Sequence, residues 1–178
     1  MTTKAIERVG IVGAGQMGSG IAEVCARAGA NVKVYDTTEA FVTAGRTRIT
    51  KSLERGVSAG KITERERDRA LEGLSFTTDL ADLADRQLVV EAVIEDDAVK
   101  AKIFAELDAL ITDPDAVLAS NTSSIPIMKI AAATKNPSRV IGLHFFNPVP
   151  VLPLVELVST LVTDPAAADR AEAFADGV

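Results

Sequence analysis

The stretch that decides the fold is residues 10–22, which read Gly-Ile-Val-Gly-Ala-Gly-Gln-Met-Gly-Ser-Gly-Ile-Ala. Its glycines have the G-x-G-x-x-G spacing, in which the first glycine permits a tight turn and the second lets the backbone approach a pyrophosphate. The third lets the following helix pack close to the strand, so that the N–H groups and the dipole of that helix face the phosphates. The residues expected at such a cofactor are Gly13, Gly15, Gln16, Met17 and Gly18.

The surroundings of this turn strengthen the prediction. The turn follows an apolar strand predicted over residues 6–12 and opens an amphipathic helix predicted over 16–28. A second apolar strand, predicted over 32–35, ends at Asp36, at about the twenty-residue offset that dinucleotide-binding folds have. The alternative is an ordinary tight turn between a strand and a helix that binds nothing.

Asp36 also distinguishes between the two nicotinamide cofactors. A carboxylate in this position accepts hydrogen bonds from a ribose diol and repels a 2′-phosphate. The next residues, Thr37 and Thr38, supply no arginine to receive such a phosphate. We therefore expect NAD rather than NADP as the cofactor. The alternative role for Asp36 is that of a helix N-cap or turn residue.

Bulk composition restricts the class of protein. A length of 178 residues suits one domain, and a net charge of −6 argues against nucleic acid as a partner. No run is long enough to span a membrane, and no secretory or transit segment is visible, so a cytoplasmic protein without a membrane partner is expected. The single cysteine, Cys25, excludes an internal disulfide and a cysteine-rich metal site, and we expect it to be a small buried residue and no metal to be bound.

Strand-like and helix-like segments alternate along the chain, which predicts an α/β fold. We expect a Rossmann-like, doubly wound, mostly parallel sheet with helices on both faces, in one domain over residues 1–178. The later strands are predicted over 88–94, 116–119, 140–144 and 154–158, and the later helices over 38–57, 79–83, 97–110 and 125–133, with two more beginning at Thr63 and Pro165. Thr63 and Glu66 have the spacing of a capping box.

The chain has a single histidine, His144, at the carboxyl end of a predicted strand. Open α/β sheets bind ligands at that end, and an imidazole suits removal of a proton from an alcohol. Glu156 interrupts the apolar segment 152–158, and burial of an unpaired charge there would cost several kcal/mol. Glu156 therefore either faces solvent on an edge strand or is buried against a cation. The alternative role for His144 is that of a structural histidine.

A polar segment, Ser-Asn-Thr-Ser-Ser at residues 120–124, follows a predicted strand and precedes a predicted helix. By itself it is typical of a helix N-cap. Its functional interpretation is a shelf of hydroxyl and amide groups beside a nicotinamide ring.

Four motifs in this order carry a family resemblance: the glycine turn, Val-Glu-Ala-Val-Ile-Glu at 90–95, the polar segment at 120–124, and His-Phe-Phe-Asn-Pro-Val-Pro at 144–150. From about Val9 to its end the chain resembles the L-3-hydroxyacyl-CoA dehydrogenases, and within them the bacterial type that acts on 3-hydroxybutyryl-CoA. The resemblance implies NAD-dependent oxidation of L-3-hydroxyacyl-CoA to 3-ketoacyl-CoA in fatty acid β-oxidation.

The resemblance also implies roles for individual residues. His144 matches the general base, Glu156 the carboxylate paired with it, and Ser123 the hydroxyl that hydrogen-bonds the reacting oxygen. The positions that match cofactor contacts, beside the adenosine ribose or around the nicotinamide half, are Asp36, Glu95, Lys100, Asn121 and Asn147. From the residues alone, Glu95 would be an exposed loop acid and Lys100 an exposed helix lysine.

Coenzyme A is polyanionic, so an acidic protein that binds it needs a local basic surface. Arg48, Lys51, Ser52 and Arg55 have the spacing of one helix face, and Lys61 follows in the next turn. The resemblance gives Ser52, Arg55 and Lys61 as substrate-binding residues at the CoA nucleotide. The alternative is a solvated helix face.

The chain departs from this family at its carboxyl end. Family members continue into an all-helical domain that closes over the acyl group and forms a homodimer, and this domain is absent from the 178 residues. We therefore expect a fragment with weak or no activity, derived from a dimeric enzyme. Two alternatives remain: a non-catalytic NAD-binding module, which binds NADH without oxidising acyl-CoA, and a sugar-acid dehydrogenase of the same superfamily.

Overall fold

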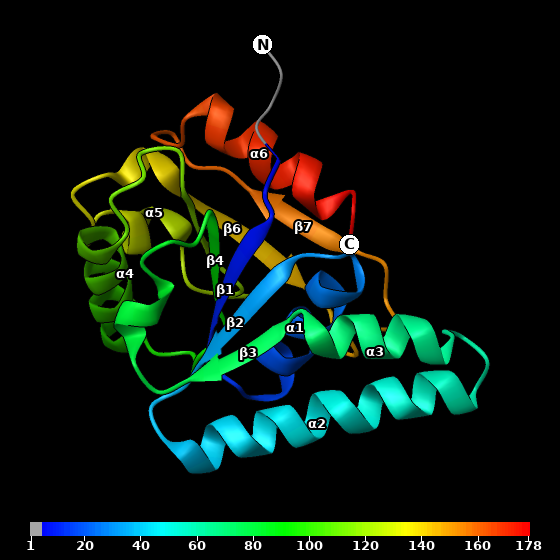
Figure 1. Cartoon of the computed structure of the whole chain (residues 1–178). Coiled ribbons are helices and arrows are strands. Elements are labelled where there is room, and N and C mark those ends of the chain that lie inside the picture. The colour runs from blue at the N-terminus through cyan, green and yellow to red at the C-terminus, as the bar shows by residue number, and fades with distance from the viewer. Residues whose placement is uncertain (1–4) are drawn as a thin grey trace.

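The computed structural model describes residues 5–178, which form one twisted sheet with helices packed against it (Figure 1). Within this range the sheet has seven strands in the order β3-β2-β1-β4-β5-β6-β7. The first six are parallel, and β7 pairs with β6 in the antiparallel direction at one edge. The strands are β1 (Arg8–Val12), β2 (Asn31–Tyr35), β3 (Leu74–Thr77), β4 (Leu88–Glu91), β5 (Val117–Ser120), β6 (Val140–Phe145) and β7 (Val155–Val158).

Helices cover both faces of the sheet, which confirms the predicted Rossmann-like class. The helices are α1 (Gln16–Arg27), α2 (Glu39–Ser58), α3 (Glu64–Glu72), α4 (Asp97–Leu110), α5 (Ile127–Ala131) and α6 (Pro165–Ala175), with short 3₁₀ turns η1 (Leu80–Leu83) and η2 (Pro137–Arg139). One apolar cluster packs α1 and α6 on one face, and another packs α4 and α5 on the opposite face. Helices α2 and α3 lie side by side and run in opposite directions (Figure 1).

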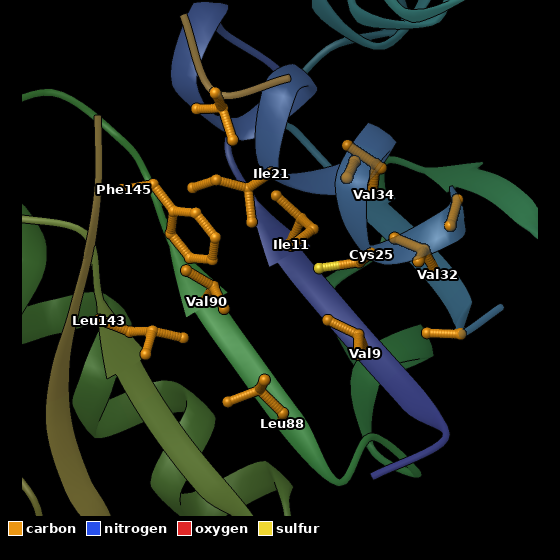
Figure 2. Packing of buried hydrophobic residues seen from close by; sticks show 14 of the residues in the cluster. Val9, Ile11, Ile21, Cys25, Val32, Val34, Leu88, Val90, Leu143 and Phe145 are labelled. Carbon is orange, nitrogen blue, oxygen red and sulfur yellow. The ribbon is translucent and has the colours of Figure 1, made fainter. Parts of the chain in front are cut away.

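The apolar strands bury side chains on both faces, as strands in the centre of a parallel sheet do. Val9 and Ile11 of β1 point into the cluster that contains α1, whereas Val12 belongs to the cluster on the other face. Figure 2 shows Ile21 and Cys25 of α1 close to Val9 and Ile11. Cys25 is fully buried, as predicted, and this burial raises the pKa of its thiol to about 12. It is therefore a packing residue.

The direction of the strand order changes between β1 and β4, because β1 is followed by β2 on one side and lies against β4 on the other. In a doubly wound sheet the carboxyl ends of the strands at this point open the ligand crevice. The glycine turn lies there. Gly13 has a φ of +103°, and a Cβ on Gly18 would lie 1.8 Å from the carbonyl oxygen of Gly13. The backbone of the turn therefore requires glycine at these two positions.

Several helix starts agree with their sequence signals. Thr63 and Glu66 form the predicted capping box at α3. The side chain of Thr38 caps α2 by accepting a hydrogen bond from the N–H of Phe41, so Asp36 is not the N-cap of that helix. Within residues 5–178, no helix combines the length and the apolar character needed to cross a bilayer.

Two sequence predictions about strands were wrong. The strand predicted over 88–94 ends at Glu91, because the carboxylate of Glu91 accepts a hydrogen bond from the N–H of Val93 and the chain leaves the sheet. Ile94, counted as part of the strand, is exposed. Strand β3 was not predicted at all, since it has only four residues, two of them polar, and lies at an edge.

Candidate active site

The glycine turn and Asp36 are joined directly. The N–H of Ala14 donates to Oδ2 of Asp36 at 2.8 Å, and the N–H of Thr37 donates to Oδ1 at 2.7 Å. Gly15 is the N-cap residue of α1, and a Cβ added to it would have no atom of the described residues within 4 Å. The turn thus offers an open cradle at a helix N-terminus, with a carboxylate at its rim, which fits the phosphates and adenosine ribose of a dinucleotide.

His144 and Glu156 meet at the opposite side of this crevice. The antiparallel register of β6 and β7 puts the two residues directly across from each other, and Nδ1 of His144 lies 2.9 Å from Oε2 of Glu156. The side chain of Glu156 is 57% exposed on the edge strand, whereas that of His144 is 19% exposed. The two alternatives for Glu156 therefore combine: it lies on an edge strand, partly in solvent, and has an imidazole as its partner.

A pocket of about 330 Å³ lies beside His144 at the carboxyl ends of the strands. Residues predicted for the cofactor and for the reaction share its wall, although they come from separate segments of the chain: Met17, Glu95, Lys100, Asn121, Ser123, His144 and Asn147. Ser123 is exposed there, so its hydroxyl is accessible to a ligand.

Two asparagines connect the cofactor side of the crevice to the histidine side. Oδ1 of Asn121 accepts from the N–H of Phe145 at 2.8 Å, while the N–H of Asn121 donates to the carbonyl of Glu91. The ends of β4, β5 and β6 are thereby held together. Similarly, Nε2 of Gln16 donates to Oδ1 of Asn147 at 3.0 Å, which ties the first turn of α1 to the segment after β6.

Lys100 is not the exposed helix lysine that the residues alone suggested, because its side chain is only 1% exposed. Its Nζ lies 2.6 Å from Oε1 of Glu91 and 3.3 Å from Oε2 of Glu95. Burial by itself would raise the pKa of Glu95, but hydrogen bonds from Thr122 and Ser124 and the charge of Lys100 outweigh it and lower this pKa below its usual value. Glu95 is therefore ionised at neutral pH.

Glu91 and Ser120 lie behind this pocket and do not line it; the sequence analysis gave Glu91 no role and counted Ser120 in the polar shelf at 120–124. Glu91 is fully buried at the end of β4, and Ser120, also fully buried, donates to its Oε2 at 2.7 Å. The signal for Glu91 in the sequence was an acid inside the otherwise apolar strand predicted over 88–94.

A second pocket, of about 540 Å³, lies between α1, α2 and residues 147–151. Its basic and polar wall includes the predicted substrate residues, Ser52, Arg55 and Lys61, together with Arg27 and Arg48. The exposed Lys51 does not contribute to this wall, so the predicted helix face is divided: Arg48, Ser52 and Arg55 line the pocket and Lys51 does not.

Arg48 and Glu23 also line this second pocket, and their contacts tie its wall together. The guanidinium of Arg48 donates to the carbonyl of Ala14 at 2.9 Å, which links α2 to the glycine turn. Glu23 is almost fully buried in the wall, and this burial raises its pKa, although Ser52 and the charges of Arg27 and Arg55 counteract the rise. Arg48 belongs to the predicted basic helix face, whereas Glu23 was not predicted for the site. Across residues 5–178, no group of three or more His, Cys, Asp or Glu side chains is arranged to hold a metal ion.

Comparison with known proteins decides the family. A profile described as the NAD binding domain of 3-hydroxyacyl-CoA dehydrogenase matches residues 8–178. The chain belongs to this family. NAD is therefore its cofactor, as the carboxylate at Asp36 indicated.

Relatives of this NAD-binding domain agree in name and in structure. A 3-hydroxybutyryl-CoA dehydrogenase of Mycobacterium tuberculosis is 77% identical over 174 residues, which are 98% of this chain and 61% of the relative. The crystal structure of FadB2 from M. tuberculosis has a TM-score of 0.96 at 76% identity, with 98% of this chain and 61% of that chain covered. For (S)-3-hydroxybutyryl-CoA dehydrogenase PaaH1 from Ralstonia eutropha the TM-score is 0.94 at 42% identity, with 97% and 61% covered. The chain thus spans about three-fifths of the length of these relatives.

The carboxylate of Asp36 provides a direct test of cofactor choice in this domain. We expect Asp36→Ala to raise the Kd of NADH by about tenfold, because a charge-assisted hydrogen bond to the ribose is lost. The Kd of NADPH should change little or fall, since the repulsion of a 2′-phosphate is removed as well. Fluorescence titration with each cofactor measures the Kd of NADH and the Kd of NADPH. An equal loss of affinity for both would show that Asp36 only supports the turn.

Proposed function

We propose that the protein of which this chain is a part oxidises L-3-hydroxyacyl-CoA to 3-ketoacyl-CoA with NAD⁺, with 3-hydroxybutyryl-CoA as the substrate type. The observation that carries the proposal is the 2.9 Å contact between His144 and Glu156 at the pocket that Ser123 and the candidate nicotinamide contacts line. The names of the relatives support the same activity.

The geometry supports a simple division of roles. Nδ1 of His144 is engaged with Glu156, which leaves Nε2 to take the proton of the 3-hydroxyl group. Glu156 stabilises the imidazolium that forms, and the Ser123 hydroxyl hydrogen-bonds the reacting oxygen. NAD⁺, which the glycine turn and Asp36 would hold, would supply the hydride acceptor for C3, so that the C–O single bond becomes a carbonyl. The proton lost from oxygen resides on His144, and the reaction balances.

The second pocket supports a substrate whose coenzyme A part binds there. Arg55 and Lys61 are exposed cations at its wall, and Ser52 contributes a hydroxyl to the same wall. In a chain of net charge −6, this local excess of basic side chains would attract the phosphates of a CoA nucleotide. The same pocket includes Gln16 of the glycine turn, so that the two candidate sites are contiguous.

The rest of the enzyme is also part of the proposal. Because the chain spans only 61% of the relatives it matches, we place the acyl pocket and the contacts between subunits in an all-helical domain outside these residues. The assembled enzyme would be a homodimer that acts in the cytoplasm in fatty acid β-oxidation. The isolated NAD-binding domain would keep its cofactor and turn over poorly.

In the enzyme extended to the length of its relatives, we expect His144→Gln to lower kcat by on the order of 10²- to 10⁴-fold, the usual contribution of a general base. NADH binding should survive, because glutamine preserves the size of the side chain and the glycine turn is untouched. Oxidation of NADH by acetoacetyl-CoA, followed by absorbance, measures turnover, and fluorescence titration measures binding.

The same assay separates the catalytic proposal from the non-catalytic alternative. The extended wild-type chain should turn over, and the 178-residue chain should bind NADH with little turnover. If the extended chain binds NADH and has no activity on acetoacetyl-CoA, the protein is a binding module or acts on another substrate. Undiminished turnover in His144→Gln would refute the role of the imidazole.

Charge reversal in the second pocket tests the CoA site. We expect Arg55→Glu to raise the Kd of coenzyme A by roughly tenfold at low salt, and the difference should shrink as ionic strength rises. Lys51→Glu is the matched control, because Lys51 is exposed on the same helix and outside the pocket wall; its effect should be less than about twofold. Calorimetry measures both. Equal effects of the two substitutions would mean that only net charge matters.

A further inference from the structure

Three charged side chains meet where β4 ends: Glu91, Glu95 and Lys100. Glu91 is fully buried and Lys100 is 1% exposed, whereas the side chain of Glu95 is 40% exposed and borders the 330 Å³ pocket. A buried ion pair is expensive to desolvate, and replacement by apolar residues is often neutral or stabilising. The presence of this pair beside the candidate nicotinamide site therefore points to a purpose other than stability.

The contacts of Glu91 are those of an ionised carboxylate, which accepts at both oxygens. Oε1 accepts from Nζ of Lys100 at 2.6 Å and from the N–H of Val93 at 2.7 Å, and Oε2 accepts from the hydroxyl of Ser120 at 2.7 Å. The ammonium is 3.3 Å from Glu95 and thus closer to Glu91. Lys100 is held on the buried side of the cluster.

The charges of this cluster do not cancel. One ammonium faces two carboxylates, and the excess negative charge falls on Glu95, the member that is exposed to the pocket. Glu95 keeps this charge, since its pKa is lowered by Thr122, Lys100 and Ser124 despite the opposing effect of burial. Among the described residues that line the pocket, His144 is the only ionisable side chain besides Glu95 and Lys100.

We propose that Glu91 is a positioning residue that makes the site prefer the oxidised cofactor, because it is the closer partner of the Lys100 ammonium and leaves Glu95 only partly neutralised. The inference rests on the proposed function, because it takes the nicotinamide ring to lie in this pocket. The ring is positively charged in NAD⁺ and neutral in NADH, so a carboxylate beside it that is only partly neutralised stabilises the oxidised form alone. Without the charge of Glu91, Lys100 neutralises Glu95 and this preference is lost.

The test is the ratio of the Kd of NAD⁺ to the Kd of NADH in the 178-residue chain. Glu91→Gln should raise this ratio roughly threefold to tenfold, the effect of one unit charge at short range in a partly solvated pocket. Ser120→Ala is the matched control, because it removes a hydrogen bond to the same carboxylate and no charge; its ratio should equal that of the wild type. Calorimetry with each cofactor provides the constants, and thermal unfolding monitors stability.

A double variant separates charge from structure. Glu91→Gln with Lys100→Met removes both members of the buried pair and leaves Glu95 charged, so the ratio should return to within about twofold of the wild-type value even if both affinities fall. A purely structural role would lower both affinities in parallel in every variant, and that result would overturn the proposal.

The remaining possible results also support or contradict the proposed role of Glu91. If Glu91→Gln does not fold, Glu95→Gln is measured instead, because the side chain of Glu95 is half-exposed and can be changed without disturbing the buried pair. Loss of the Glu95 charge should also raise the ratio of the Kd of NAD⁺ to the Kd of NADH. An unchanged ratio in Glu95→Gln overturns the inference. If the wild type binds both cofactors but the ratio is insensitive to these charges, only the inference fails. If the wild type binds neither form, the cofactor site itself is refuted, and the inference with it.

Discussion

The pairing of β7 with β6 is the contact on which the rest of the site depends. Its antiparallel register sets Glu156 across from His144, so the pairing of the two strands places the carboxylate beside the imidazole. A shift of this register by one residue would turn Glu156 to the other face of the strand, because side chains alternate along a strand. The only antiparallel strand in residues 5–178 therefore has a direct role in positioning the proposed base.

The parallel part of the sheet supplies the other half of the site. The change of direction between β1 and β4 leaves a crevice at the carboxyl ends, and the glycine turn and the ends of β4, β5 and β6 surround it. Asn121 ties these strand ends together, and the hydrogen bond between Gln16 and Asn147 joins the glycine turn to the segment after His144. Cofactor and base are thus positioned by one connected framework.

Local chemistry could be predicted from the sequence, and contacts made by packing could not. The glycine turn and the capping box at Thr63 depend on neighbouring residues, so their signals survive in a short window. Asp36 could be predicted although it contacts the turn across 22 residues, because dinucleotide-binding folds fix the offset between the two. The burial of Lys100 depends on Glu91, nine positions earlier, and is settled only when α4 packs against the sheet. Strand β3 likewise needs β2 as a partner, because its own four residues carry little apolar pattern.

The central claim is that the nicotinamide ring comes to rest beside His144. As the chain has a single histidine, the ring signals of His144 in a ¹H–¹⁵N NMR spectrum are unambiguous. The account predicts that saturating NADH shifts these signals and that ADP, which occupies only the adenosine end of the crevice, leaves them in place. If NADH binds fully without moving them, or if ADP moves them as much, the nicotinamide does not lie at the imidazole and the proposed site is wrong.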